Sequence, residues 1–227
     1  MNPQVPTINR SQTAVSSTNK VLRNTYMLLS MTLLFSAAAA GLSMALNVPY
    51  MVSLGTSIAA LVLLWFVVPR TANSSAGIFV VFAITGLLGF GLGPMLNHYL
   101  ALPNGPQLVM MAMGGTAAIF LGLSAYVLTT RKDFSFMGGF LMVGILVAFL
   151  ASIVALGGSL LGFEVSGLSL AVSAMFVLLM SGLILYETSS IIHGGETNYV
   201  LATVTLYVSI YNLFTSLLHL LGFASND

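Results

Sequence analysis

The sequence predicts an all-α membrane protein, a bundle of seven transmembrane helices with the seventh helix at its centre. The first observation is composition: 58% of the 227 residues are hydrophobic and only 5% are charged, whereas about a quarter of the residues in a soluble domain are charged. The second is a succession of seven apolar segments, each close to the ~20 residues that cross the hydrocarbon core. The third is a polar stripe along the last segment, and such a stripe should face other helices rather than lipid.

The apolar segments follow a polar beginning and leave no room for a soluble domain. Met1–Asn19 is rich in Ser, Thr, Asn, Gln and Pro and has no early apolar run of the kind found in a cleavable signal peptide. We therefore expect residues 1–19 to form a flexible tail, residues 20–223 the transmembrane domain and residues 224–227 a short external end. The seven segments are Val21–Leu46, Tyr50–Val68, Ala76–Leu100, Gln107–Thr130, Phe136–Leu161, Leu168–His193 and Tyr199–Phe223.

The basic residues predict the orientation of the bundle. With seven spans, all six Lys and Arg residues fall on one side, and the loops of the opposite side contain none. The positive-inside rule makes the basic side cytoplasmic, so the N-terminus lies inside the cell and the C-terminus outside. The six residues are Arg10, Lys20, Arg23, Arg70, Arg131 and Lys132.

Glu187 is the one acidic residue that the sequence places within a membrane span. It precedes His193 by six residues, which puts it roughly 9 Å below the end of its helix. A carboxylate at that depth costs several kcal/mol unless it is protonated, paired or facing water. Two interpretations stay open: an ion-facing ligand helped by Ser209 and Asn212, or a protonated side chain that donates a hydrogen bond inside the bundle.

The polar stripe on the last segment has a helical period. Its members recur at steps of 4, 3, 4 and 3 residues, so they share one face of a helix. We expect this face to look into the bundle and to lie close to Glu187. The members are Thr205, Ser209, Asn212, Ser216 and His219.

A short polar hinge joins the last two segments. Gly194 and Gly195 allow one helix to end and the chain to reverse tightly, and His193 and Glu196 are placed to form hydrogen bonds within the hinge. A glycine-rich run that ends at Pro94 lies within an apolar span. It lacks the lysine that follows the glycines in a phosphate-binding loop, so we expect a kink at Pro94 and not a phosphate site.

The residue types argue against an enzyme, a cofactor or a metal site. The chain has no cysteine, which excludes disulfides, thiolate metal sites and cysteine nucleophiles. Ser124 would need a histidine at its own depth to act as a nucleophile, and neither His193 nor His219 lies there, so we interpret Ser124 as a packing residue. A retinal-type pigment is excluded because the only lysines are Lys20 and Lys132. We expect no nucleic-acid partner.

The last two segments, GLILYETSSIIHGGETNYVLATVTLYVSIYNLF, resemble the signature region of the Bax inhibitor family, also called the transmembrane Bax-inhibitor-motif proteins. The upstream stretch Gly122–Gly139, GLSAYVLTTRKDFSFMGG, resembles that family's connection between helices four and five. The resemblance covers Val21 to the C-terminus, and KVLRNTYMLLSMTL, IIHGGETNY and LLGFAS are closest to a bacterial branch whose members modulate the membrane protease FtsH.

The resemblance implies a bundle in which six helices enclose the seventh, located in a bacterial inner membrane, with FtsH and its membrane-associated regulators as partners beside the lipid bilayer. Some family members are described as pH-sensitive calcium leak channels with two facing aspartates on helices six and seven. In this sequence Glu187, after Tyr186, keeps the first carboxyl group, whereas Ser209 stands in place of the second. A hydroxyl group cannot share protons with a carboxyl group as a second carboxyl group does, so the pH-gated leak is the alternative function.

Overall fold

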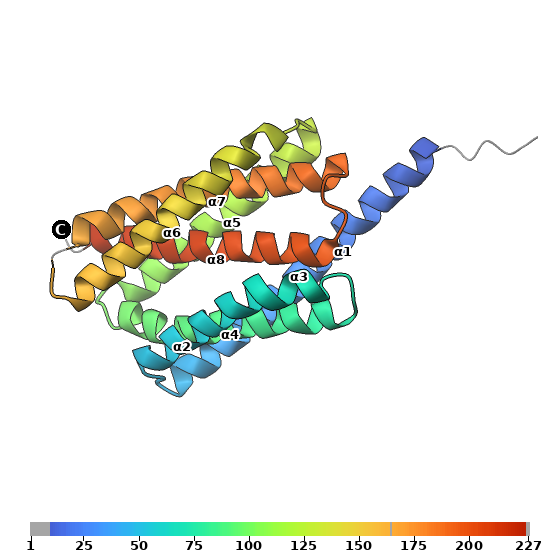
Figure 1. Cartoon of the computed structure of the whole chain (residues 1–227). Helices are drawn as coiled ribbons and strands as arrows, with labels where there is room; N and C mark the ends of the chain where they lie inside the picture. Colours follow the sequence, from blue (N-terminus) through green and yellow to red (C-terminus); the bar gives the residue numbers. More distant parts are fainter. Residues whose placement is uncertain (1–9, 164, 226–227) are drawn as a thin grey trace, which may run out of the picture.

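A computed structural model describes residues 10–163 and 165–225, with residues 10–17 described by their backbone alone. It confirms the predicted fold class: within the described residues, seven helical stretches are long and apolar enough to cross a membrane. Figure 1 shows them side by side as an antiparallel bundle. The helices are α1 Arg10–Ala45, α2 Tyr50–Val62, α3 Val68–Thr71, α4 Ala76–Leu100, α5 Gly105–Thr130, α6 Gly138–Leu160, α7 Ser166–His193 and α8 Tyr199–Ala224.

The first helix starts earlier than the sequence suggested. We expected a flexible tail as far as Asn19, but α1 is helical from Arg10, and in Figure 1 it extends beyond the rest of the bundle. Residues 10–17 therefore add about two helical turns before Thr18. The remainder of the predicted tail, residues 1–9, lies outside the described residues, as do residues 226–227 of the predicted external end.

The second span, expected to end at Val68, continues to Thr71. A π-helical turn, Leu63–Val67, joins α2 to α3, and together they form one stretch, Tyr50–Thr71, with Pro69 inside. Proline has no N–H group and its ring collides with the carbonyl four residues earlier in a regular α-helix. The wider π turn just before Pro69 relieves that conflict, so the helix continues. Helix α4 also contains a proline, Pro94, and continues past it as an α-helix.

The last helix, α8, is the most buried span, as the polar stripe predicted. More than half of its most apolar stretch is buried, the largest share among the seven spans. It packs against α1, α4, α5 and α7, whereas α2 packs mainly on α4 and α6 mainly on α7. Four helices rather than six therefore surround α8, and α2 and α6 lie on the outside, where their residues meet lipid.

Glycines of α4 allow α4 to pack closely against α1. A Cβ atom at Gly89 would lie 2.8 Å from the Cα atom of Ser36, and one at Gly93 would lie 2.9 Å from the carbonyl carbon of Ser43. The two glycines are four residues apart and share one helix face, an arrangement that lets membrane helices approach backbone to backbone. Gly91 faces the other way, where its carbonyl oxygen accepts a hydrogen bond from Ser53 of α2.

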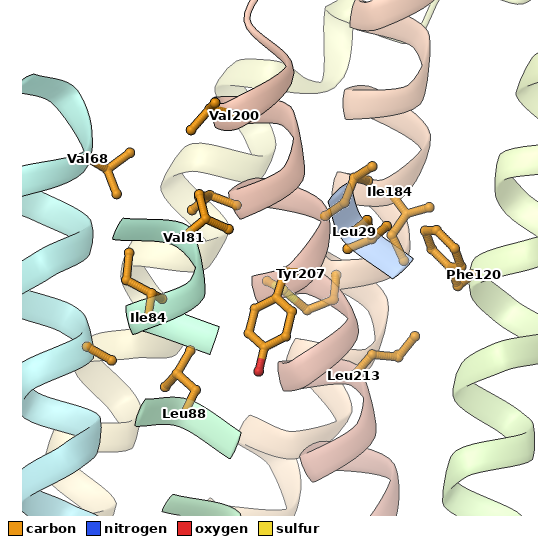
Figure 2. Packing of buried hydrophobic residues seen from close by; sticks show 14 of the residues in the cluster. Leu29, Val68, Val81, Ile84, Leu88, Phe120, Ile184, Val200, Tyr207 and Leu213 are labelled. Carbon is orange, nitrogen blue, oxygen red and sulfur yellow. The ribbon is translucent and has the colours of Figure 1, made fainter. Parts of the chain in front are cut away.

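Tyr207 of α8 lies in the largest cluster of buried side chains, near Ile84, Leu88 and Leu213 (Figure 2). Its hydroxyl group donates to the carbonyl oxygen of Thr85 on α4 over 3.2 Å and lies 2.6 Å from the hydroxyl group of Ser36 on α1. One buried side chain thus joins three helices through hydrogen bonds. The sequence did not indicate this role, because a tyrosine in an apolar helix has the same pattern as any aromatic core residue.

Candidate functional site

Glu187 lies in α7, inside the membrane span, and is 6% exposed. Among the described residues, its Oε1 atom has no hydrogen-bond partner. A buried polar atom without a partner costs free energy of about 1–3 kcal/mol, more for a charged group. The burial of Glu187 therefore lowers the stability of the fold.

The register of α7 against α8 places Glu187 opposite the beginning of the polar stripe. Ser173 Oγ of α7 and His219 Nδ1 of α8 lie 2.9 Å apart, and the two helices are antiparallel. Fourteen residues further along α7 is Glu187, and fourteen residues back along α8 is Thr205. Ser209 is four residues beyond Thr205, about 6 Å away along the helix axis.

The stripe faces the interior, but no described hydrogen bond joins it to Glu187. Ser209 and Ser216 are buried, and the other members are partly buried. Ser209 Oγ donates to the carbonyl oxygen of Thr205 over 2.8 Å, and Asn212 Nδ2 donates to that of Val208 over 2.8 Å. Both side chains donate within their own helix, and no hydrogen bond in the described part of the chain joins Glu187 to Ser209 or Asn212.

Other unpartnered polar atoms occur in the half of the bundle that holds Glu187. Within the described residues they are Thr25 Oγ1, Tyr26 Oη, Ser124 Oγ and Thr188 Oγ1. Ser124 is six residues from the end of α5, a depth of roughly 9 Å that matches Glu187. Buried polar groups of this kind generally hold ordered water. Sequence reasoning missed Thr25 and Tyr26, since nothing in their spacing distinguishes them from residues that face lipid.

The hinge between α7 and α8 forms as the glycines suggested. Gly194 adopts a left-handed conformation (φ 78°), and the N–H group of Gly195 donates to the carbonyl oxygen of Ser190, which closes the end of α7. Glu196 Oε1 accepts the N–H group of Asn198 over 2.6 Å. The hinge is therefore an ordered turn in which Glu196 has a bonding role.

Asn198, the last hinge residue, for which the sequence predicted no role, attaches the hinge to a second loop. Its side-chain oxygen caps α8 by accepting the N–H groups of Val200 and Leu201. Its Nδ2 atom donates to Ala72 O over 3.0 Å and to Asn73 Oδ1 over 2.8 Å. A loop asparagine followed by an apolar helix is an N-cap signal. The sequence does not show, however, that this asparagine also bonds to Ala72 and Asn73 in another loop.

His193 attaches the hinge to a third segment, the α5–α6 connection, residues 131–134. His193 Nε2 lies 3.1 Å from Arg131 O, and Ser189 Oγ accepts the N–H group of Phe134 over 2.9 Å. The hinge thus joins both neighbouring loops at the end of the bundle that carries Arg70, Arg131 and Lys132. We call this end the basic end.

Asp133, in the same connection, is exposed and lies outside the spans. The backbone N–H group of Ser135 donates to Asp133 Oδ1 over 2.9 Å and, together with the side chain of Ser135 and the nearby His193, lowers the pKa of the Asp133 carboxyl group. Among the described residues, no three His, Asp or Glu side chains gather as a metal site would require.

Comparisons with known proteins found a matching family model and several similar chains. The family model described as "Inhibitor of apoptosis-promoting Bax1" matches residues 18–226. A protein of Escherichia coli named "Modulator of FtsH protease YccA" is 51% identical over 96% of this chain and 97% of its own length, and its counterpart from another Escherichia coli strain is named an inner membrane protein. An uncharacterized membrane protein of Vibrio cholerae is 47% identical over the full length of both chains.

Proposed function

Because the chain belongs to the Bax inhibitor family, we propose that it binds the membrane-anchored protease FtsH and restrains the action of FtsH on membrane proteins. The observation that carries this proposal is the 51% identity, over nearly the whole of both chains, to a protein named as a modulator of that protease. The bacterial inner membrane is the corresponding location. The segregation of basic residues supports a cytoplasmic N-terminus and a periplasmic C-terminus.

The structure supports a mechanism in which the chain is gripped but resists extraction. Helix α1 extends from the basic end as far as Arg10, its first residue, where a cytoplasmic protease can reach it. The bundle that follows this N-terminal segment is stabilised by the glycine contacts between α1 and α4 and by the hydrogen bonds of the Tyr207 hydroxyl group. A protein that the protease engages readily but unfolds slowly occupies the protease for a long time. While it is occupied, the protease degrades fewer of its other substrates. Glu187 and the hinge residues are not required for this mechanism, and no catalytic role is proposed for them.

Affinity purification from native membranes in mild detergent tests the partner. We expect FtsH, with or without its membrane-associated regulators, to be recovered in stoichiometric amount with the tagged chain. The control is an unrelated seven-helix protein with the same tag and expression level. Recovery of FtsH at the level of this control would contradict the proposal.

Removing residues 1–9 tests whether the protease engages the chain at its N-terminal residues. A protease that threads its substrate needs an extended end to grip, so the shortened chain, which still begins at the helical Arg10, is expected to be degraded by FtsH several-fold more slowly than the full chain. The measurement is the half-life of the protein after synthesis is stopped, in cells with and without FtsH. Replacing residues 1–9 with a Gly/Ser segment of equal length distinguishes loss of length from loss of sequence. An unchanged half-life would show that the protease grips elsewhere.

A second candidate function, weak cation passage, is favoured by one observation: the buried Oε1 atom of Glu187 has no hydrogen-bond partner among the residues that the structure describes. If Glu187 is an ion ligand, Glu187→Gln keeps the shape and removes the charge, and calcium flux into vesicles should fall about tenfold, the equivalent of 1.4 kcal/mol. The matched control is Glu196→Gln in the hinge, outside the membrane spans. Equal flux for the wild-type chain and Glu187→Gln would eliminate the ion-ligand role.

A further inference from the structure

A cavity of about 630 Å³ lies between α1, α4, α5 and α8, within the membrane spans. Buried residues form its floor, among them Ser36 of α1, Phe120 of α5 and Tyr207 of α8. Exposed residues of α1 and α5 form its rim, among them Gly41 and Met113. The cavity is therefore a groove that opens sideways toward the lipid, and we call it the α1–α5 groove.

The groove exists because α1 and α5 pack on the same neighbours but not along each other. Both helices pack against α4 and α8, and the described residues show no extended packing of α1 on α5. The rings of Tyr26 and Phe120 join the two helices, with centres 6.0 Å apart. Beyond that contact, the wall on α1 is built from small residues, Ala37, Ala40 and Gly41, and nothing lies within 4 Å of the position that a Cβ atom would take at Gly41.

The lining of the groove suits hydrocarbon. None of the side chains that line it is charged. Four of its five hydroxyl groups already form hydrogen bonds within the chain, and only that of Tyr211 has no partner in the described part of the chain. The four bonded residues are Ser30, Ser36, Thr116 and Tyr207. An apolar space of this kind stays free of water, and it has no group to compensate the burial of an ion or of a charged lipid headgroup.

The size of the groove matches a single hydrocarbon chain. An apolar cavity of roughly 150 Å³ takes up one benzene molecule, so the 630 Å³ of this groove accommodates on the order of 20 carbon atoms, the size of one phospholipid acyl chain. A helix is 10–12 Å wide with its side chains, so a length of roughly 20 Å takes up on the order of 2,000 Å³. The groove is therefore too small for a helix of a partner protein or of a second copy of this chain.

The groove lies in the half of the bundle opposite the basic end. Its lining residues on α1 run from Ser30 to Met44, next to the end of the helix, and those on α5 begin at Val109, close to the start of that helix. The stretch from Ser30 to Met44 rises by roughly 21 Å, more than the ~15 Å of hydrocarbon that one leaflet contributes. An acyl chain that enters beside Met44 therefore reaches the middle of the membrane while its headgroup stays at the surface.

We propose that the α1–α5 groove binds one acyl chain of a phospholipid from the leaflet opposite the basic end. Protein interiors contain few voids larger than a water molecule, and atoms that line a void lose their contacts. The acyl chain supplies the contacts that α1 and α5 do not make with each other. The site stands whether or not the protein binds FtsH, because it rests on the shape and lining of the groove alone.

Photocrosslinking tests the site with a phosphatidylcholine that carries a diazirine near the end of one acyl chain. The purified full chain is reconstituted into vesicles that contain this lipid and irradiated, and mass spectrometry locates the label. We expect label on residues 207–214 of α8, the most buried span, which an acyl chain reaches through the groove. Label on α2 and α6 reports contact with bulk lipid. Label on α2 and α6 without label on residues 207–214 would overturn the proposal.

Filling the groove provides the matched comparison. Gly41→Leu together with Ala117→Leu places side chains in the groove from both walls, so the label on residues 207–214 should fall several-fold while that on α2 and α6 is unchanged. Gly114→Leu is the control, because Gly114 also has open space at its Cβ position but does not line the groove. Equal labelling of residues 207–214 in the filled variant and the wild-type chain would show that lipid reaches α8 by another route, contrary to the proposal.

Native mass spectrometry of the wild-type chain, released from a mild detergent, needs no substitution. We expect one phospholipid to remain bound to each chain, and we expect that lipid to be lost from the filled variant but kept in Gly114→Leu. A wild-type chain that retains no lipid would contradict the proposal. A dimer without lipid would contradict it as well, and would show that a second copy of the chain covers the groove.

Discussion

Replacing Gly89 with alanine is expected to destabilise the bundle, although alanine is the better helix former. The substitution contributes about 1 kcal/mol of helix propensity. The added Cβ atom would, however, meet the carbonyl oxygen, the hydroxyl group and the Cα atom of Ser36 on α1. Backbone atoms cannot rotate away as a side chain can, so α1 and α4 must separate. Overpacking of this kind typically costs 1–3 kcal/mol and sometimes more, and the net effect is a loss of stability.

Gly114→Ala is the matched control. Gly114 also lies within a long helix, α5, but nothing lies within 4 Å of the position that its Cβ atom would take. There the propensity gain is not opposed, so we expect a rise of up to about 1 kcal/mol in stability. The measurement is thermal or denaturant unfolding of both variants in the same detergent. Shifts of the same sign in Gly89→Ala and Gly114→Ala would show that α1 and α4 are not in backbone contact.

Replacing Tyr207 with phenylalanine is expected to have the second large effect, a loss of about 1–3 kcal/mol in the free energy of unfolding. The change removes only the hydroxyl oxygen, so the packing among Ile84, Leu88 and Leu213 is kept. Ser36 Oγ loses its 2.6 Å partner, and the bond to Thr85 O disappears. The link from α8 to both α1 and α4 is then lost.

Tyr211→Phe is the control, because Tyr211 stacks on Tyr207 with ring centres 6.4 Å apart but makes no side-chain hydrogen bond in the described part of the chain. Its effect should stay within about 0.5 kcal/mol, as for substitutions that break no specific interaction. A double variant, Ser36→Ala with Tyr207→Phe, should cost less than the sum of the single variants, since both remove the same bond. Additive effects would show that the two hydroxyl groups do not interact.

Much of the architecture followed from local patterns. Seven apolar segments predicted seven spans, because a membrane forces each crossing to satisfy its backbone within a helix. The polar stripe predicted that α8 lies at the centre, because polar side chains avoid lipid. Gly194 and Gly195 predicted the end of α7 at its observed place. The boundaries at Asn19 and Val68 were wrong, since helix α1 extends further toward the N-terminus and a π turn lets the second span continue through Pro69.

What the sequence by itself determined, then, is which residues lie in the membrane and which face of α8 is polar. The tertiary structure alone decided the partners: Tyr207 bonds Ser36 across 171 positions of sequence, Asn198 reaches Ala72 across 126, and His193 reaches Arg131 across 62. The physical reason is that burial in lipid depends on the composition of each segment alone. A hydrogen bond or a glycine contact between helices depends on their mutual rotation and register, which arise only when all the helices pack together.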